Sequence, residues 1–268
     1  MRFSGFHTHT VFSDGKQTPR ENVEAALALG FSALGFSDHS YTAFDTSYCI
    51  PKEKYAEYIQ TVRALQKEYE GRIEIALGIE YDGFTVMPER KELDYVLGDC
   101  HYVKTSGGYF SVDHCIEGHR YLCETFFGGD YTAFARAYFE GYTAAMTELK
   151  PDILGHFDLV SKFCLTDEND PRYLSYAREA LRACLSTVPF IELNTGAIAR
   201  GMRKVPYPAP YLLDDVKECG GIPILGSDSH EVKNLDFYFK EAIELLKAHG
   251  FQTIGSFRAG KLIEIPLE

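Results

Sequence analysis

The sequence has no long apolar run, no paired cysteines and no excess of positive charge. No stretch reaches the ~18 apolar residues of a membrane span. The N-terminus has one arginine and then polar, histidine-rich sequence, without the apolar core of a signal peptide. The seven cysteines are scattered and never form a C-x-x-C pair, which favours reduced thiols over a disulfide framework. We therefore expect a soluble, cytoplasmic protein with no membrane partner.

The charge balance disfavours one class of partner. Lys and Arg number 27 against 39 Asp and Glu, for a net charge of −12. Such a chain is not a generic polyanion binder, so nucleic acid is not expected, although local positive sites such as bound metal ions fit this balance. The sequence also lacks a linker, a low-complexity tract or a shift in composition. We expect residues 1–268 to form one domain; nothing in the sequence sets the oligomeric state.

A pair of histidines stands at the end of the first apolar run, residues 3–7, in the phrase Phe6-His7-Thr8-His9. Side chains alternate between the two faces of a strand, so a spacing of two puts both imidazoles on one side. There they can bind one metal ion. An isolated H-x-H pair is weak evidence, because a surface or capping pair has the same spacing.

Apolar runs alternate with helical patterns along the rest of the chain. The runs predicted as strands cover residues 33–37, 73–79, 95–98, 151–155, 190–194 and 222–226. The patterns predicted as helices cover residues 18–30, 52–69, 130–150, 171–187, 210–219 and 235–249. This alternation favours a parallel sheet covered by helices, and about seven such units indicate an α/β protein with a TIM-like barrel.

Most of the predicted strands end in a histidine or a carboxylate. In a barrel the functional groups lie at the carboxyl ends of several strands. The residues at these ends are His7, His9, His39, Glu80, His101, His156, Asp228 and His230. Each one alone is also consistent with a capping, turn or surface role. Together they place six of the nine histidines and two acids at one rim, which chance explains poorly.

Three histidines lie outside this pattern. His249 ends the last predicted helix beside Gly250, where an imidazole is favourable with the helix dipole, so we interpret it as structural. His114 and His119 lie in an insertion over residues 104–129 that is rich in glycine and aromatic residues. For these two, both substrate contact and a structural role stay open.

Read in order, the residues form the motifs H-x-H-x-x-x-x-D, S-D-H, G-I-E, G-x-x-H, G-H-F-D and S-D-x-H, from Gly5 to beyond His230. This ordered series resembles that of the polymerase and histidinol phosphatase (PHP) superfamily, histidinol-phosphatase branch. Phrases at residues 36–40, 152–158 and 194–208 are similar to that branch in particular. The resemblance implies a distorted barrel of seven β/α units, in agreement with the count above.

The resemblance also implies three divalent metal ions. The first would be held by His7, His9, Glu80 and Asp228; the second by Glu80, His101 and His156; and the third by Asp14, His39 and His230. Mixed imidazole and carboxylate ligands suit zinc, iron or manganese, so the metal identity stays open. The chain departs from the commoner Gly-Ser-Val-His at Asp99-Cys100. Cys100 adjoins a ligand and either changes the metal preference or merely packs.

Phosphate ester hydrolysis is the chemistry that this centre implies. Clustered dications offset the charge of a phosphate dianion, and a hydroxide bridging two metals would attack phosphorus. Asp228 or His230 would protonate the leaving alkoxide. Arg200 and Arg203, in the loop after Asn194, and Lys162 would bind phosphate oxygens, with a solvated loop as the alternative.

The expected reaction is hydrolysis of L-histidinol phosphate to L-histidinol in histidine biosynthesis. One alternative is a phosphoesterase acting on nucleotides or another small phosphate ester. Others are a non-catalytic appendage of a polymerase and a metal storage or sensor protein. Side chains available for the organic part of the substrate, which the sequence does not locate, are Asp45, Tyr102, Tyr109, Phe110 and Asp113.

Overall fold

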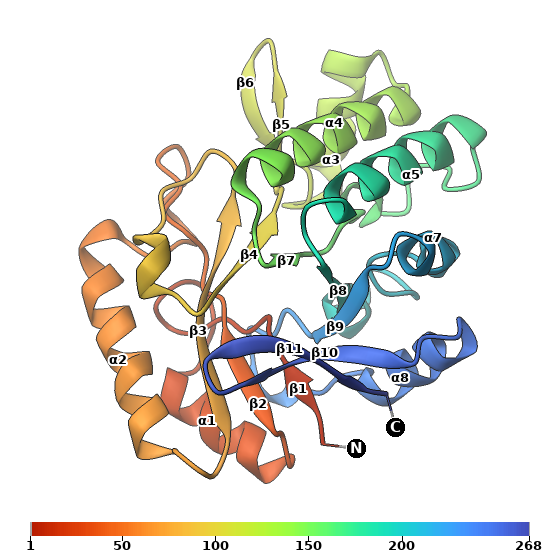
Figure 1. Ribbon diagram of the computed structural model, residues 1–268. Helices are drawn as coiled ribbons and strands as arrows, with labels where there is room; N and C mark the ends of the chain where they lie inside the picture. Colours follow the sequence, from red (N-terminus) through yellow and green to blue (C-terminus); the bar gives the residue numbers. More distant parts are fainter. Residues whose placement is uncertain (1, 268) are drawn as a thin grey trace.

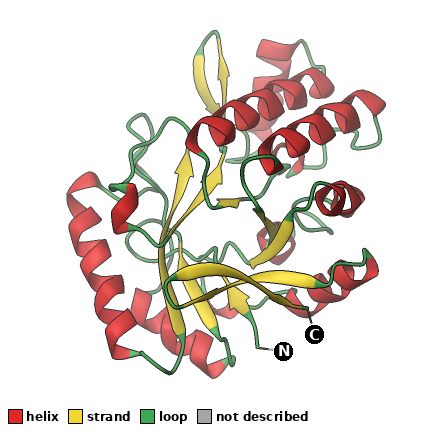
Figure 2. Cartoon of the chain, viewed as in Figure 1, coloured by secondary structure: helices red, strands yellow, loops and turns green. Residues whose placement is uncertain are grey.

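Seven parallel strands form the body of the protein, whose computed structural model describes residues 2–267 (Figures 1 and 2). In sheet order they are β1 (Ser4–Gly5), β2 (Ala33–Phe36), β3 (Glu74–Asp82), β4 (Tyr95–Asp99), β7 (Ile153–Leu154), β8 (Phe190–Asn194) and β9 (Ile222–Gly226). The outer strands meet, because Phe6 N donates to Leu225 O at 3.1 Å and Thr8 pairs with Ser229. The sheet is thus a nearly closed barrel, which confirms the predicted fold class.

Tyr95 is fully buried in the barrel interior. Its hydroxyl lies 2.8 Å from Phe6 O and 2.9 Å from Phe36 O, so one side chain joins three strands. The strands facing it have glycine where the ring approaches: a Cβ on Gly35 would lie 2.6 Å from the Tyr95 hydroxyl, and one on Gly78 2.3 Å from Cζ. Close packing of this kind fixes the register in which the strands deliver their carboxyl ends.

A C-terminal hairpin closes the amino end of the barrel. It consists of β10 (Thr253–Arg258) and β11 (Lys261–Pro266), which run antiparallel and cross the barrel in Figure 1. Phe257, only 4% exposed, packs with Phe6 and Ile224 inside the barrel. The runs that the sequence predicted as strands did not include this hairpin. At the opposite, carboxyl end, loops that follow the strands line a cavity.

Helices and short 3₁₀ turns connect the strands. The α-helices are α1 (Pro19–Ala28), α2 (Tyr55–Glu68), α3 (Ile116–Phe127), α4 (Tyr131–Leu149), α5 (Pro171–Leu185), α6 (Gly196–Ala199), α7 (Leu213–Glu218) and α8 (Phe239–Ala248). The 3₁₀ turns are η1 (Lys52–Lys54), η2 (Arg90–Glu92), η3 (Leu159–Ser161), η4 (Pro210–Leu212) and η5 (Val232–Asn234). Among residues 2–267, no helix has the length and apolar character needed to cross a membrane.

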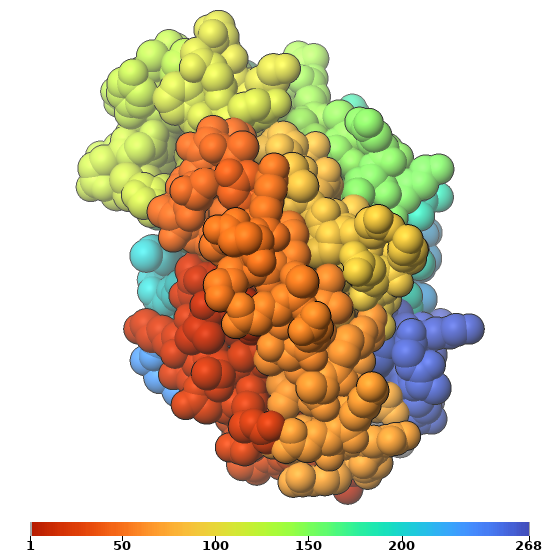
Figure 3. Space-filling view, turned by 90° about the vertical axis from the view of Figure 1, so that its left-hand side faces the viewer, coloured from red at the N-terminus to blue at the C-terminus, as the bar shows by residue number. Residues whose placement is uncertain are grey.

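Two segments differ from what the sequence predicted. The last helix begins at Phe239 rather than at 235, because Tyr238 has φ 63° and this left-handed residue interrupts the helical path. The insertion over 104–129 holds regular structure that the sequence did not indicate: a hairpin of β5 (Tyr102–Thr105) and β6 (Gly108–Ser111), and then α3. In Figure 3 this yellow-green segment stands above the orange face formed around α2.

Helix α4 supports the site directly. The Tyr142 hydroxyl donates to Gly155 O at 2.8 Å, and the Tyr138 hydroxyl donates to Phe157 O at 3.2 Å. Both tyrosines are fully buried, and their bonds bracket His156. The segment after β7 is therefore held by its backbone on either side of that histidine.

Candidate metal centre

The carboxyl ends of the strands bring all of the predicted metal ligands together. Their ligand atoms form overlapping groups within 4.8 Å of one another. The groups are His9, Asp14, His39 and His230; His7, Glu80, Asp99 and His156; His7, His9 and Asp228; and His39, Glu80 and His101. Each predicted residue appears, and Asp99 is the only addition among the described residues.

Glu80, at 1% exposure, is the centre of this cluster. The nitrogens within 3.4 Å of its carboxylate oxygens belong to His7 (3.2 Å), His9 (3.4 Å), His39 (2.9 Å), His101 (3.4 Å) and His156 (3.1 Å). Burial alone would raise the pKa of Glu80, but the surrounding imidazoles, His39 foremost, bring that pKa well below its ordinary value. One ionised carboxylate thus faces five rings.

Several nitrogens in this cluster have no hydrogen-bond partner. Among residues 2–267, His7 Nε2, both ring nitrogens of His9 and Glu80 Oε2 are buried and make no hydrogen bond of regular geometry, although they lie close to one another. Burial, with the neighbouring His230 and His39, lowers the pKa of His9 to about 3, so this imidazole is neutral and offers a lone pair. Unpaired buried lone pairs are costly, and a divalent cation satisfies them. The residues present therefore fit a metal site.

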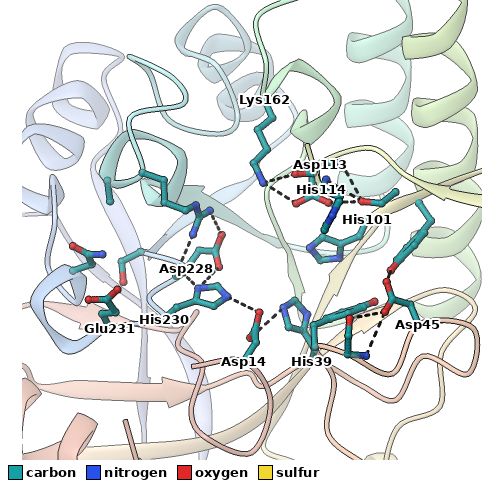
Figure 4. A pocket seen from close by; sticks show the side chains of 18 residues that line it. Asp14, His39, Asp45, His101, Asp113, His114, Lys162, Asp228, His230 and Glu231 are labelled. Carbon is teal, nitrogen blue, oxygen red and sulfur yellow. Dashed lines mark hydrogen bonds and ion pairs between the residues drawn. The ribbon is translucent and has the colours of Figure 1, made fainter. Parts of the chain in front are cut away.

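Asp14 closes the side of the cluster that faces solvent. Figure 4 shows it between His39 and His230, and its Oδ2 lies 3.1 Å from His230 Nε2. The side chains of Asp14 and His230 are 32% and 29% exposed, unlike the buried His9. The loop before Asp14 is fixed by Asp38, whose carboxylate accepts from Thr10 N at 2.7 Å.

His9 belongs to both sides of the centre. The resemblance assigned it to one site with His7, and their ring centroids are 5.1 Å apart. The ring centroids of His230 and His39 are nearer, at 4.2 and 4.4 Å. The structure thus sets His9 at the junction of two candidate sites.

Asp228 links the cluster to a cation. Its Oδ1 lies 3.3 Å from His9 Nε2, while Arg200 Nη2 donates to its Oδ2 at 2.6 Å. Burial would raise the pKa of Asp228, but Arg200 and His7 bring it well below the ordinary value. Gly196 leaves room for this pair, because a Cβ there would lie 2.8 Å from Asp228 Cβ and 2.9 Å from Arg200 Nη2.

A cavity of about 450 Å³ opens beside the cluster, and the predicted phosphate-binding residues differ in whether they line it. Arg200 and Lys162 line it, and Lys162 Nζ donates to Asp113 Oδ2 at 2.9 Å (Figure 4). Arg203 does not line it: this side chain is 5% exposed and donates to Glu168 Oε2 at 3.0 Å. Its guanidinium, which also lies over the Tyr207 ring, is turned into the protein, contrary to the expectation.

Of the remaining side chains considered for substrate contact, some line the cavity and others do not. Asp45, Tyr102, Asp113 and His114 line the cavity, whereas Tyr109, Phe110 and His119 do not. His119 is buried, with Nδ1 2.7 Å from Val112 O. His249 ends α8 and lies 2.8 Å from an oxygen of Asp214, which agrees with a structural role.

Three buried carboxylates behind the histidines were missed. They are Asp82, Asp99 and Glu192, at 3%, 0% and 1% exposure, and they contact His101, His156 and His7. A signal was available for two of them: Glu192 lies within the predicted run 190–194 and Asp99 directly follows the run 95–98, where an acid is unusual. What the sequence could not indicate is which histidine each one faces.

Comparison with known proteins identifies the family. The sequence profile of the PHP domain matches residues 5–196. The chain belongs to the PHP domain family. A Deinococcus radiodurans protein named "Probable histidinol-phosphatase" is 31% identical over 96% of this PHP chain and 96% of its own length. The Bacillus subtilis protein named "Histidinol-phosphatase" is 22% identical over 89% of this chain and 97% of its own.

A solved structure confirms the fold of this PHP protein. It is the histidinol phosphate phosphatase of Lactococcus lactis, complexed with zinc, L-histidinol and phosphate. The TM-score is 0.71 with 24% identity, over 98% of this chain and 99% of that chain. At this identity the likeness shows the TIM-like barrel common to both proteins.

Proposed function

We propose that this chain is a metal-dependent phosphomonoesterase that hydrolyses L-histidinol phosphate to L-histidinol and phosphate, as one domain over residues 1–268. One observation carries the proposal: a buried carboxylate, Glu80, has five imidazole nitrogens within 3.4 Å, beside a cavity lined by Arg200 and Lys162. Relatives that match most of the chain are named as histidinol-phosphatases, which supports this substrate.

The proposed centre takes three divalent ions, from among zinc, iron and manganese. The ligands that we assign are His7, His9, Glu80 and Asp228 for the first ion; Glu80, His101 and His156 for the second; and Asp14, His39 and His230 for the third. When bound, the ions would supply positive charge against the phosphate dianion and an activated water. Their ligands are neutral imidazoles and carboxylates, the set that suits all three metals.

The phosphate group would be oriented by two cations that line the cavity. Arg200 is anchored by Asp228, through Nη2 to Oδ2 at 2.6 Å and Nη1 to the backbone O at 3.1 Å. Lys162 is anchored by Asp113. Anchored cations lose little side-chain freedom on binding, so they hold phosphate oxygens at low entropic cost.

Protonation of the leaving alkoxide is assigned to His230 or Asp228, which both line the cavity. Arg200 favours the ionised form of Asp228, which makes that carboxyl the weaker proton donor of the two. His230 lies at the open side of the cluster, with Nε2 3.1 Å from Asp14. We therefore favour His230 for this step, from a state in which its Nε2 is not bound to an ion, because a neutral metal-bound imidazole is a poor proton donor.

The test is phosphate release from L-histidinol phosphate, beside nucleoside monophosphates and a generic aryl phosphate, with and without chelator. We expect chelator-sensitive turnover and a preference for histidinol phosphate of ~100-fold, or about 2.7 kcal/mol in the transition state. If another ester is preferred, the metal site stands and the substrate is wrong. No turnover with added zinc, iron or manganese would favour a storage or sensor protein.

A further inference from the structure

The imidazoles of the centre fall into two sets that differ in what lies behind them. In the first set, which we call the backed half, each ring has Nε2 toward Glu80 and Nδ1 toward a second, buried carboxylate. The Nδ1 distances are 2.7 Å for His7 to Glu192, 3.1 Å for His101 to Asp82 and 2.8 Å for His156 to Asp99. The three pairs share one orientation although they come from different strands.

The second set, the open half, consists of the rings of His39 and His230 with Asp14, together with His9, which is shared because it is also assigned to the first ion. Among residues 2–267, no carboxylate outside the proposed ligands contacts these rings. His39 lies between Glu80 (2.9 Å) and Asp14 (3.8 Å). His230 Nδ1 faces the backbone O of Asp228 at 3.0 Å. The open half therefore lacks the second layer of carboxylates.

The fold reserves space for two of the backing carboxylates. A Cβ on Gly155 would lie 2.1 Å from Asp99 Oδ2, and a Cβ on Gly226 would lie 1.7 Å from Glu192 Oε1. Any side chain at either glycine would occupy the place of the carboxylate. The glycines at the ends of β7 and β9 thus leave room for the carboxylates of the adjacent strands β4 and β8.

Asp99 has no other evident role. It is fully buried, and among the described residues neither of its oxygens has a geometrically regular hydrogen bond. Its polar neighbour is His156 Nδ1 at 2.8 Å. Asp82 and Glu192 each make an additional hydrogen bond. Asp82 accepts from the backbone N of His101 at 2.7 Å, and Glu192 accepts from the backbone N of His156 at 2.9 Å. Burying a carboxylate is costly, so a structural role alone is a poor reason for Asp99.

We propose that Asp82, Asp99 and Glu192 are positioning residues that make the backed half bind divalent ions more tightly than the open half. A carboxylate on Nδ1 keeps the proton there, aims the Nε2 lone pair at the ion and makes the ring more basic. Loss of such a partner typically weakens metal affinity about 10- to 100-fold. The inference rests on the metal centre of the proposed function.

The test is a zinc titration. Apo-protein is prepared by dialysis against a chelator and titrated with Zn²⁺ against a chromophoric competitor, and bound zinc is counted by mass spectrometry. The wild type is expected to show two affinity classes. Asp99→Asn should weaken the tight class about 10- to 100-fold, and Asp14→Asn should weaken only the other class.

Asp158→Asn is the matched control. Asp158 is fully buried and close to His156 in sequence, but its Oδ2 accepts from Ala209 N at 3.2 Å. This variant should keep both zinc classes. Equal losses in Asp99→Asn and Asp158→Asn would overturn the proposal, since burial alone would then explain them. A single zinc class in the wild type would overturn it even if a variant fails to fold.

The outcome of the zinc titration can be distinguished from the outcome of the turnover assay that tests the proposed function. Two zinc classes that respond as stated, in a protein that does not hydrolyse L-histidinol phosphate, would support the positioning role and reject the substrate. Turnover of that ester by a protein with one zinc class would do the reverse.

Discussion

The two ends of the barrel are built from the same seven strands, yet they differ in what holds them together. At the amino end Phe257 of the hairpin packs with Phe6 and Ile224 in an apolar cluster, beside a buried hydrogen bond between the hydroxyls of Ser256 and Ser4. At the carboxyl end Glu80 and its imidazoles form a buried polar cluster whose lone pairs are not all satisfied by protein. Apolar packing at the amino end fixes the arrangement of the strands, and this arrangement holds the ligand side chains in place at the carboxyl end.

This contrast teaches where stability and chemistry reside. A cluster with unpaired buried nitrogens opposes folding, since such groups lose their water without gaining a partner. The packed amino end offsets that loss. Changes at the carboxyl end should therefore act mainly on metal binding and turnover, and changes at the amino end mainly on the free energy of unfolding.

The largest expected effect is that of Glu80→Gln. An amide cannot serve as the shared anionic ligand, so kcat/KM should fall by about 10⁴-fold, equal to about 5.4 kcal/mol, with loss of bound metal. Far-ultraviolet circular dichroism should be unchanged. Steady-state kinetics and metal analysis measure the outcome. A variant that retains metal and turnover would contradict the proposed difference between the two ends of the barrel.

Phe257→Ala tests the opposite end. Removing a buried ring that is 4% exposed should lower the free energy of unfolding by about 4 kcal/mol. Urea denaturation measures the change. At low denaturant the kcat/KM of the folded protein should match the wild type. A loss of turnover in fully folded protein would show that the two ends are coupled.

Arg200→Lys and Arg203→Lys form a matched pair. The first removes a two-point donor from the cavity and should lower kcat/KM on the order of 10-fold, or ~1.4 kcal/mol. The second alters the buried contact with Glu168 and should act on the free energy of unfolding instead. Equal kinetic effects of the two substitutions would contradict the distinction drawn from their positions.

The smallest effect is expected for Gly141→Ala. Gly141 lies within α4, and a Cβ there meets nothing within 4 Å, so the free energy of unfolding should rise by up to about 1 kcal/mol. Gly155→Ala is the matched substitution at the carboxyl end and should instead reduce metal retention, because its Cβ displaces Asp99. Thermal melts with metal analysis distinguish them.

Much of the fold and of the candidate ligand set was predictable because the signals are local. Apolar runs predict the strands, and a polar residue such as Glu80 or His156 at the end of a run indicates the carboxyl rim. The order of the motifs then supplied Asp14, which belongs to a loop. Local sequence and motif order were therefore sufficient to predict those ligands whose position depends only on the strand or loop to which they belong.

The rest depends on contacts between distant strands. Glu192 faces His7 because β8 lies beside β9 and β9 closes onto β1, a neighbourhood that no local pattern specifies. Arg203 was wrongly expected at the cavity because Arg200 and Arg203 share one loop, and their directions are decided by Asp228 and Glu168.

The most direct test of the central claim is a crystal structure of the zinc- or manganese-loaded protein with anomalous data collected at the metal edge. We expect anomalous peaks about 2.0–2.2 Å from Glu80 oxygens and from Nε2 of His7 and His156. Peaks confined to other surfaces, or none within reach of Glu80, would contradict the account of the carboxyl end as a metal centre.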